Sequence, residues 1–448
     1  MAGPGRVSRR PGVEESGENR ARPSPGFQAA PSPKLRRRAA PNAMRPLSIA
    51  IVSKADDTGG GASRVAAELA RLLIADGHRV HHWRAFGRPE PHARDLYGSF
   101  ALPIRAVRKL ARLSGWPDWP PVEYPLLARR LADYDVVHFH DLTTALSPLT
   151  PSLVARRKPV AWTFHDCSPF TGGCLYPLDC PKFKSRCGPC PQLGAWPLDT
   201  RFDFTGPIHA LKRRLFAENT IRAVVPSRWS REMAVASGMF ARPPEVIPNG
   251  IDTDVFRPFD RQALRRELGL PDDRRIVLIA AYDLSYPNKG AAFALEALRR
   301  LDEPAPFLLA VGGLGRWTEA AFSPLAFRHV GFLADDREKA RWFAAADVAL
   351  NASLTDTFSL VTAEAMACGT PTVGFATGGI PELVEHGVSG WMVPTGDAAA
   401  LSHGLARALA GDAPKHWGEA ARARIVERFS HPGFLAAHLS LYREMMGR

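Results

Sequence analysis

The chain of 448 residues has no run of about 18 apolar residues, the length that a helix needs to cross a bilayer. We therefore expect no membrane-spanning helix. Residues 1–43 contain few large apolar residues and no apolar segment of the kind found in secretory signals. Their richness in Pro, Gly, Ala, Ser and Arg predicts a disordered basic tail. Such a tail could bind nucleic acid or anionic lipid, or the natural start could be Met44, just before the first predicted strand.

Two common phosphate-site signatures are missing as well. Gly59, Gly60 and Gly61 lie between a predicted strand and a predicted helix, but no Gly-Lys-Ser/Thr follows them, so they do not form a P-loop. Three glycines allow close backbone approach to a ligand beside the next helix N-terminus, although a flexible turn would explain them too. Residues 273–430 contain no acidic pair of the DxD type beside a strand end. We therefore expect no metal ion in catalysis.

Apolar segments with strand character alternate with amphipathic helices through the rest of the chain, which predicts parallel sheets with crossover helices. The length predicts two domains, and a hydrophobic fraction of 45% is that of a soluble globular protein. We expect an α/β protein with two Rossmann-like domains, 44–250 and 273–430, facing across a cleft and joined by a linker at 251–272. Predicted strands are 47–53, 78–86, 135–140, 159–164, 223–226, 245–248, 275–281, 307–312, 328–331, 348–351 and 370–375; predicted helices include 62–76, 291–301 and 336–346. Ligands should lie at the carboxyl ends of the strands.

The segment from Asp356 to Pro371, DTFSLVTAEAMACGTP, is the most informative part of the sequence. A helix beginning near Leu360 would place free backbone N–H groups beside Asp356 and Glu364. Such a helix end can hold a phosphate while the two acids bind hydroxyl groups. A sugar joined to a nucleotide through a diphosphate carries both features. The alternative is a solvated helix N-terminus, where acids are favoured by the helix dipole.

This segment closely resembles the C-terminal signature of the retaining glycosyltransferases of family 4 (glycosyl transferases group 1, GT-B fold). The family motif usually has Glu at both ends, whereas this chain has Asp356 at the first. Further matching motifs follow in the family's order over nearly all of the chain from Met44: Gly59-Gly60-Gly61-Ala62, His165-Asp166, Asn249-Gly250-Ile251-Asp252, Lys289-Gly290 and Gly378-Gly379-Ile380-Pro381-Glu382. The resemblance implies a GT-B fold in which 44–250 binds the acceptor, 273–430 binds the nucleotide-sugar donor, and a helix within 431–448 crosses back to the first domain.

The resemblance also implies a donor site. Glu364 would bind the ribose hydroxyls, and Asp356 would lie near the donor sugar. Lys289 would neutralise the diphosphate and the charge that develops as the nucleotide leaves. The remaining donor-binding positions would be Gly60, Gly61 and the backbone amides of Ser359, Leu360 and Val361. The Arg that usually precedes the family's Lys is missing from 281–288, so either another base replaces it or diphosphate binding depends more on Lys289 and backbone amides.

Catalysis is assigned by the same resemblance to His165 and Asp356. His165 would lie beside the anomeric carbon and orient the donor. The transfer would pass through an oxocarbenium-like state, and the resemblance implies no protein nucleophile. We therefore favour attack from the face of the leaving group, with the leaving phosphate taking the acceptor proton. His138 and His140, two residues apart in DVVHFHD, are alternatives to His165.

Four of the six cysteines lie in a segment, 167–191, that would form an insertion in the first domain: Cys174, Cys180, Cys187 and Cys190. The last two form a CxxC knuckle, which is typical of tetrahedral zinc sites. We expect a structural zinc; reduced thiols and two disulfides are the alternatives. The segment resembles a cysteine-bearing loop in a subset of family-4 enzymes of bacterial exopolysaccharide synthesis. Because it directly follows His165, it should border the acceptor side of the cleft.

The stretch 104–119 predicts a basic amphipathic helix. The apolar face would hold Ile104, Val107, Leu110 and Leu113, the basic face Arg105, Arg108, Lys109 and Arg112, and Trp116 and Trp119 would follow. Such a helix could bind an anionic membrane surface. It could equally pack on the sheet with a solvated basic face.

Together these features predict a retaining glycosyltransferase that moves a hexosyl group from a nucleotide-diphosphate sugar to a glycan or lipid-linked glycan in cell-surface polysaccharide synthesis. We expect a cytoplasmic enzyme, in contact with the inner face of the membrane if the basic helix binds there, and no nucleic-acid partner. The alternatives are a nucleotide-sugar epimerase or phosphorylase on the same fold, and a non-catalytic GT-B-like binding protein.

Overall fold

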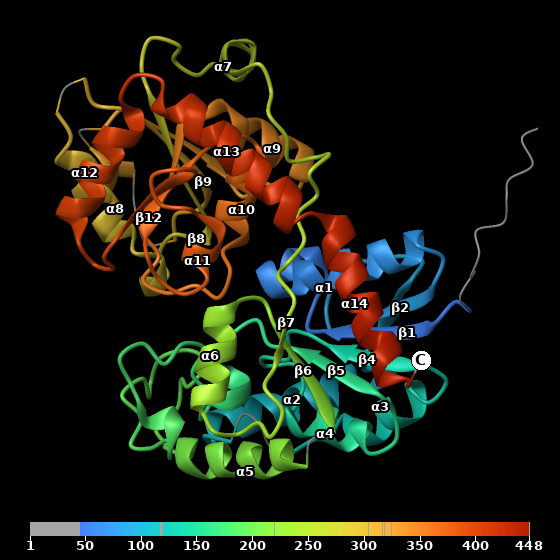
Figure 1. Ribbon diagram of the computed structural model, residues 1–448. Coiled ribbons are helices and arrows are strands. Elements are labelled where there is room, and N and C mark those ends of the chain that lie inside the picture. The colour runs from blue at the N-terminus through green and yellow to red at the C-terminus, as the bar shows by residue number, and fades with distance from the viewer. Residues whose placement is uncertain are drawn as a thin grey trace, which may run out of the picture. The chain divides into compact units, whose positions relative to one another are not determined.

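The computed structural model describes residues 45–116, 120–218, 220–302, 304–315, 317, 319–323 and 325–447. The predicted tail at 1–43 and Trp119 lie outside these residues. Two parallel sheets organise the described part of the chain (Figure 1). We call the first sheet with its helices the first lobe, and the second sheet with its helices the second lobe. The predicted class, α/β with two Rossmann-like domains, is confirmed.

The first sheet has the strand order β3-β2-β1-β4-β5-β6-β7. Its strands are β1 (Ser48–Ser53), β2 (Arg79–Arg84), β3 (Ala93–Asp95), β4 (Val136–Phe139), β5 (Val160–Thr163), β6 (Ile221–Val225) and β7 (Glu245–Val246). Its helices are α1 (Gly61–Ala75), α2 (Ala101–Leu113), α3 (Tyr124–Arg130), α4 (Leu149–Ala155), α5 (Thr205–Ala217) and α6 (Arg228–Ala236). The chain order reverses between β1 and β4, so the loops after these two strands diverge and leave room for a ligand.

The second sheet has the order β10-β9-β8-β11-β12-β13. Its strands are β8 (Ile276–Asp283), β9 (Phe307–Gly313), β10 (Phe327–Gly331), β11 (Val348–Asn351), β12 (Thr372–Phe375) and β13 (Gly390–Val393). Its helices are α7 (Arg261–Leu268), α8 (Ala291–Arg299), α9 (Asp336–Ala345), α10 (Leu360–Ala367), α11 (Ile380–Leu383), α12 (Ala398–Leu409) and α13 (Ala413–Arg428). Here the switch lies between β8 and β11, and α10 follows β11.

Each sheet is covered by apolar side chains on both faces. In β1, Ala50 and Val52 belong to one buried cluster, whereas Ile49 and Ile51 belong to another. This alternation follows from the strand repeat of two residues, and strands buried on both faces are typical of parallel sheets between helices. The segment predicted as a linker, 251–272, contains α7 and contributes to the core of the second lobe.

The last helix, α14 (His431–Met445), packs on the first sheet although it follows the second lobe in sequence (Figure 1). Phe434, Leu441 and Tyr442 are buried with Ile49 of β1. The hydroxyl of Tyr442 is 2.7 Å from Nδ1 of His138 at β4. The helix therefore completes the core of the first lobe.

Helix α2 corrects the prediction made for 104–119. Ile104, Arg108 and Ala111 are buried, but Leu110 and Leu113 are 66% and 50% exposed. A helix turns about 100° per residue, so Leu113 lies about 180° from Ile104 and cannot share its face. The side of α2 opposite its buried side is therefore apolar, Arg105 and Arg112 lie between the two sides, and Arg108 is on the buried side.

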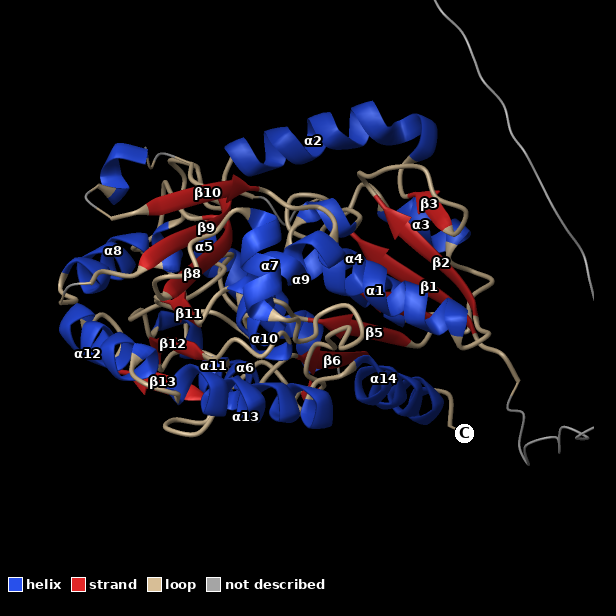
Figure 2. Cartoon of the chain, turned by 90° about the horizontal axis from the view of Figure 1, so that it is seen from above, coloured by secondary structure: helices blue, strands red, loops and turns tan. Residues whose placement is uncertain are grey.

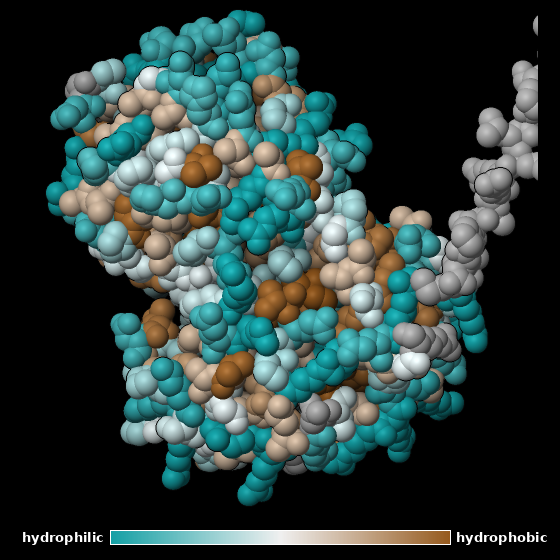
Figure 3. All heavy atoms as spheres, in the orientation of Figure 1, coloured by the Kyte–Doolittle hydropathy of each residue, from teal (hydrophilic) through white to brown (hydrophobic). Residues whose placement is uncertain are grey.

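Among the described residues, no helix has both the length and the apolarity to cross a bilayer. The face of the molecule in Figure 3 is covered largely by hydrophilic residues, with the apolar ones in small groups. Helix α2 packs on the core of the first lobe and lies along one edge of the molecule in the view from above (Figure 2).

Candidate functional site

Helix α10 begins where the sequence predicts a phosphate-binding helix. Its N-cap, Ser359, has a left-handed backbone with φ of 70°, a costly conformation for a residue other than glycine. Oδ1 of Asp356 accepts hydrogen bonds from the N–H groups of Phe358 at 3.3 Å and Ser359 at 3.0 Å. The carboxylate of Asp356 thus occupies part of the predicted amide site.

Lys289 and Asp356, predicted separately as a diphosphate ligand and a sugar-facing acid, are partners in the structure. Nζ of Lys289 is 2.9 Å from Oδ2 of Asp356. The lysine precedes α8, and its side chain is 26% exposed. The positive charge of Lys289 is therefore balanced by the neighbouring Asp356 carboxylate.

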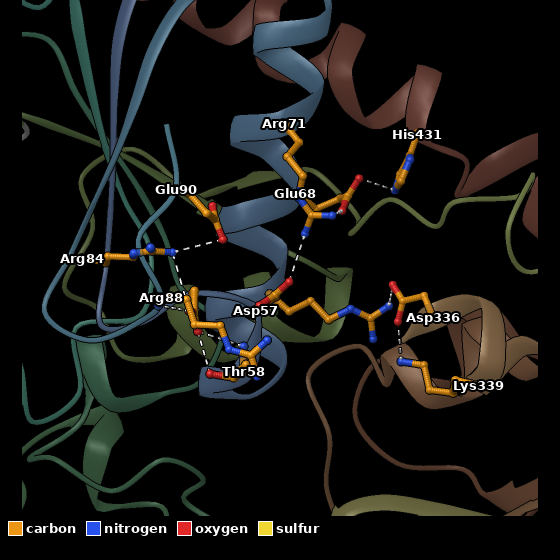
Figure 4. A network of polar contacts seen from close by, with 12 residues as sticks. Asp57, Thr58, Glu68, Arg71, Arg84, Arg88, Glu90, Asp336, Lys339 and His431 are labelled. Carbon is orange, nitrogen blue, oxygen red and sulfur yellow. Dashed lines mark hydrogen bonds and ion pairs between the residues drawn. The ribbon is translucent and has the colours of Figure 1, made fainter. Parts of the chain in front are cut away.

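Glu364 is buried in α10 at 1% exposure and contacts two cations. Nη1 of Arg64 on α1 lies 2.7 Å from its carboxylate, and Nζ of Lys339 on α9 lies at 3.3 Å. Both cations also contact Asp336, at 2.7 Å and 3.2 Å. Figure 4 shows Asp336 and Lys339 on α9 opposite the charged side chains of α1. The cluster joins the first lobe to the second.

Arg64 and Lys339 are the functional candidates that sequence reasoning missed. The family's second base is absent before Lys289, and these two side chains bring positive charge to the same region from other helices. Arg64 stands in the first turn of α1, directly after the glycine loop. That position was the available signal, but only the fold brings α1 beside α10.

A cavity of about 450 Å³ lies between these elements. The predicted residues that line it are Gly60, Gly61, Leu360, Val361 and Glu364. A Cβ atom on Gly61 would lie 3.4 Å from Leu360, which shows how closely the N-termini of α1 and α10 approach. Gly60 has φ of 97°, a conformation that favours glycine. Lys289, Asp356 and Ser359 are not part of this lining, and Ser359 directly precedes Leu360.

His165 lies at the carboxyl end of β5, as predicted. Its Nε2 is 3.0 Å from Nδ1 of His140, which follows β4. The hydroxyl of Thr357 donates to the carbonyl oxygen of His165 at 2.8 Å, so the loop that carries Asp356 is tied to the first lobe. Burial lowers the pKa of His165 to about 4. His165 is therefore a neutral hydrogen-bonding group at neutral pH.

The two alternative histidines differ in their surroundings. His138 contacts the hydroxyls of Tyr442 at 2.7 Å and Thr163 at 2.8 Å, so both ring nitrogens have partners inside the protein. His140 faces His165 and has a buried Nε2 without a hydrogen-bond partner. Burial lowers the pKa of both well below the usual range. His138 is thus a packed residue at the strand end, and His140 adjoins the site.

A second cavity, of about 280 Å³, lies in the first lobe. His165 and Asp166 line it together with basic side chains of α2. Asp166 accepts a hydrogen bond from the N–H of Ser168 at 2.7 Å, and burial raises its pKa to about 6. This cavity holds none of the residues that line the cavity at Glu364.

The cysteine segment, 167–191, packs against the core of the first lobe. Phe170 and Phe183 are buried in the core, and one small cavity is lined by all four clustered cysteines: Cys174, Cys180, Cys187 and Cys190. All six cysteines of the chain are free thiols, so the predicted disulfide alternative is wrong. Within the described residues, no three His, Cys, Asp or Glu side chains converge closely enough to hold a metal ion as they stand.

Comparisons with known proteins identify two glycosyltransferase families. Residues 59–255 match the family Glycosyltransferase Family 4, and residues 274–411 match Glycosyl transferases group 1. D-inositol 3-phosphate glycosyltransferases from Mycobacterium bovis (strain BCG / Pasteur 1173P2) and Mycobacterium tuberculosis (strain ATCC 25618 / H37Rv) are each 36% identical over 217 residues. These matches cover 45% of this chain and 44% of each relative, so the chain spans under half the length of the curated relatives it matches.

Solved structures resemble the chain over most of its length. Anabaena HepE with UDP-glucose has a TM-score of 0.62 and 18% identity, over 88% of this chain and 100% of that chain. Sucrose-phosphate synthase from Thermosynechococcus elongatus has a TM-score of 0.65 and 20% identity, over 90% and 99%. At identities of 18% and 20%, the likeness to these structures shows the fold alone. The two family matches cover most of the first and the second lobe. The chain is therefore a member of the family-4, group 1 glycosyltransferases with the GT-B fold.

Proposed function

We propose that the protein is a retaining glycosyltransferase that moves a sugar from a nucleotide-diphosphate sugar to a glycan or lipid-linked glycan. One observation carries the proposal: the glycine loop before α1 and the N-terminus of α10 share a cavity with the buried carboxylate of Glu364. Two helix N-termini suit a diphosphate, and a buried carboxylate suits the hydroxyls of a ribose. The relative HepE was solved with UDP-glucose, which supports the same donor class.

In the proposed reaction the bond from the anomeric carbon to the diphosphate oxygen breaks, and a bond to the acceptor oxygen forms on the same face. The acceptor proton passes to the leaving phosphate oxygen. Lys289 would leave Asp356 and stabilise the charge of the departing diphosphate. His165, which burial keeps neutral, would orient the donor sugar by hydrogen bonding. Asp356 would then be free to bind the sugar hydroxyls.

The acceptor side supports a role at a membrane surface in polysaccharide synthesis. Helix α2 exposes Leu102 at 79% and Leu110 at 66%, beside the exposed cations Arg105 and Lys109. Exposed apolar side chains next to basic ones are typical of helices that lie in the interface of an anionic bilayer. A lipid-linked acceptor would be reached from that position.

A structural zinc at the four clustered cysteines remains a proposal. Their cavity, of about 20 Å³, exceeds the volume of one water-sized sphere, and the N–H of Gly172 already donates to Sγ of Cys187 at 3.3 Å. The thiols would have to move closer together to bind a metal. Zinc would hold the segment that borders His165 without taking part in the transfer. The proposal is wrong if metal analysis finds no zinc in purified protein and chelation causes no loss of stability.

The test is a screen of nucleotide-sugar donors by thermal shift, followed by turnover with and without acceptors. A productive donor should raise the melting temperature of the wild type. Glu364→Gln removes the charge while keeping the shape, and should weaken donor binding about tenfold or more. Glu385→Gln, a change at an exposed acid of the same lobe, should leave it unchanged.

Each rival function predicts a different result. Conversion of the donor sugar without any acceptor would identify an epimerase, and release of sugar phosphate a phosphorylase. Donor binding without turnover under any condition would identify a binding protein. If no nucleotide sugar binds at all, the proposed function is wrong.

A further inference from the structure

The cavity of the first lobe lies where an acceptor would have to bind. It is formed at the carboxyl ends of β4 and β5, where His140 and His165 stand, and α2 forms another of its sides. Its volume of about 280 Å³ is close to the lower end of small-molecule pockets, which begin at about 300 Å³. A ligand of one sugar ring with a charged group would fill it and reach His165.

The lining of this cavity is strongly basic. Its cations are Arg105, Arg108, Lys109 and Arg112 of α2 and Lys212 of α5, and its acids are Asp141 and Asp166. Asp141 is already bound to Lys54 at 3.0 Å. Asp166 is buried, and burial raises its pKa, so it loses part of its negative charge near neutral pH. Positive charge in this concave site is therefore in excess.

The four cations of α2 are spaced three and four residues apart, so they lie next to one another and repel. Arg112 has an acidic neighbour, Asp199, at 3.5 Å. Among the described residues no acid forms an ion pair with Arg105 or Lys109, which are the exposed cations of this row. Such a row is unfavourable for the empty protein, and an anion bound in the cavity would relieve the repulsion.

Two of the cations are held in place from behind. Nη2 of Arg105 donates to the carbonyl oxygen of Ala85 at 2.7 Å, and its guanidinium lies 4.4 Å from the centre of the Phe86 ring. Nζ of Lys212 donates to the carbonyl oxygen of Ser168 at 2.9 Å. Side chains fixed in this way lose little freedom when a ligand binds.

We propose that this cavity binds the phosphoryl group of the acceptor, so that the acceptor is a sugar or polyol bearing a phosphate or diphosphate. The inference rests on the proposed function and names the acceptor class. Guanidinium groups bind phosphoryl oxygens through paired hydrogen bonds, which suits a row of arginines. A soluble phosphorylated sugar and a polyprenyl diphosphate-linked sugar share this chemistry.

Binding is tested with the full chain and inorganic pyrophosphate as the probe. UDP at saturating concentration first occupies the donor cavity, and calorimetry then measures the affinity for pyrophosphate. The double variant R105Q/K109Q changes two exposed side chains and should weaken binding at least tenfold. The matched control R129Q/R157Q removes two exposed cations of the same lobe outside the cavity and should bind as the wild type does. Equal affinity in both double variants would overturn the inference.

Turnover then distinguishes the two sources of the phosphoryl group. Sugar monophosphates in solution, a short polyprenyl diphosphate sugar in detergent, and their phosphate-free forms serve as acceptors for the same donor. One phosphorylated class should be used and its phosphate-free form should not; equal use of the phosphate-free forms would contradict the inference. Release of UDP from the donor by water, in the absence of acceptor, reports separately on the proposed function. That rate should be the same in the control R129Q/R157Q, whose changes lie outside the cavity, and in the wild type.

Discussion

At the scale of single residues, the site is held by groups that neutralise one another before any substrate arrives. Lys289 is paired with Asp356, and Glu364 is shared by Arg64 and Lys339. A buried carboxylate left without its cations would be strongly destabilising, so this pairing lets the empty site remain folded. We expect the diphosphate of a bound donor to take the place of the Asp356 carboxylate at Lys289.

His140 illustrates a residue that would act through another. Its Nδ1 is the hydrogen-bond partner of Nε2 of His165, and it lies behind that ring at the end of the neighbouring strand. His140→Leu removes the bond and should lower kcat between about tenfold and about a hundredfold, with KM little changed. Steady-state kinetics with a productive donor and acceptor measure both constants.

The conservative variant separates positioning from packing. The side-chain amide of His140→Asn occupies nearly the place of Nδ1 and can keep the bond to His165, so most of kcat should return. If the Asn and Leu variants lose kcat equally, His140 supports the strand end and does not orient His165.

At the scale of elements, α2 presents three sides of different character. Its buried side anchors the helix through Ile104 and Ala111, its basic row lines the first-lobe cavity, and its apolar outer side is exposed. Packing within the lobe does not account for the apolar character of the outer side, because Leu102 and Leu110 are 79% and 66% exposed and contribute little to the core. A bilayer surface would cover them and bring a lipid-linked acceptor to the basic row.

Vesicle sedimentation tests this role of α2. The wild type should bind vesicles that contain anionic lipid, more strongly at low than at physiological salt, because charge attraction is screened. Leu102→Ser with Leu110→Ser should reduce binding several-fold through loss of apolar contact. Val388→Ser changes an exposed apolar residue of the second lobe and should have no effect. Equal binding by all three proteins would place α2 away from the membrane.

At the scale of the whole molecule, a group of buried histidines links the site to α14. His165 contacts His140, and His138 contacts Tyr442. The ring of His438 on α14 is tilted against that of His138, with the ring centres 5.5 Å apart. Burial lowers the pKa of His165 and His438 to about 4 and lowers that of the other two well below the usual range. All four are therefore uncharged in the folded protein near neutral pH.

This burial makes the folded state sensitive to acid. Each histidine has a lower pKa folded than unfolded, so its contribution is complete above about pH 6.5 and is lost as pH falls toward about 4. Asp166 has the opposite sign, since burial raises its pKa to about 6, but it is one group against four. The temperature of the unfolding midpoint should therefore decrease as the pH is lowered from about 7 to about 5.

His438→Leu provides the matched comparison for this pH dependence. It removes one titrating group whose Nε2 has no hydrogen-bond partner, so the midpoint should fall less steeply with acid than in the wild type. Identical pH profiles for the two proteins would show that His438 does not carry this effect.

The sequence predicts the fold class well because the strands of a parallel sheet are short apolar runs that local patterns reveal, as in 47–53 for β1 and 348–351 for β11. It also predicts the start of α10 at Leu360, since the helix formers after it end at glycine and proline. The pairing of Arg64 with Glu364 depends on two helices 300 residues apart in the chain, and no local pattern encodes it. The predicted orientation of α2 was wrong because apolar residues lie on several sides of that helix. Only packing determines which of these sides is buried.

Helix α14 also bears on how the protein is made. The side of β1 that carries Ile49 and Ile51 is covered in part by Phe434 and Tyr442, which the ribosome adds only after the entire second lobe. During translation the nascent first lobe therefore exposes this apolar surface until the second lobe and α14 have been synthesised. Partly folded chains with such surfaces aggregate readily, so a chaperone that shields this surface would raise the yield of native protein.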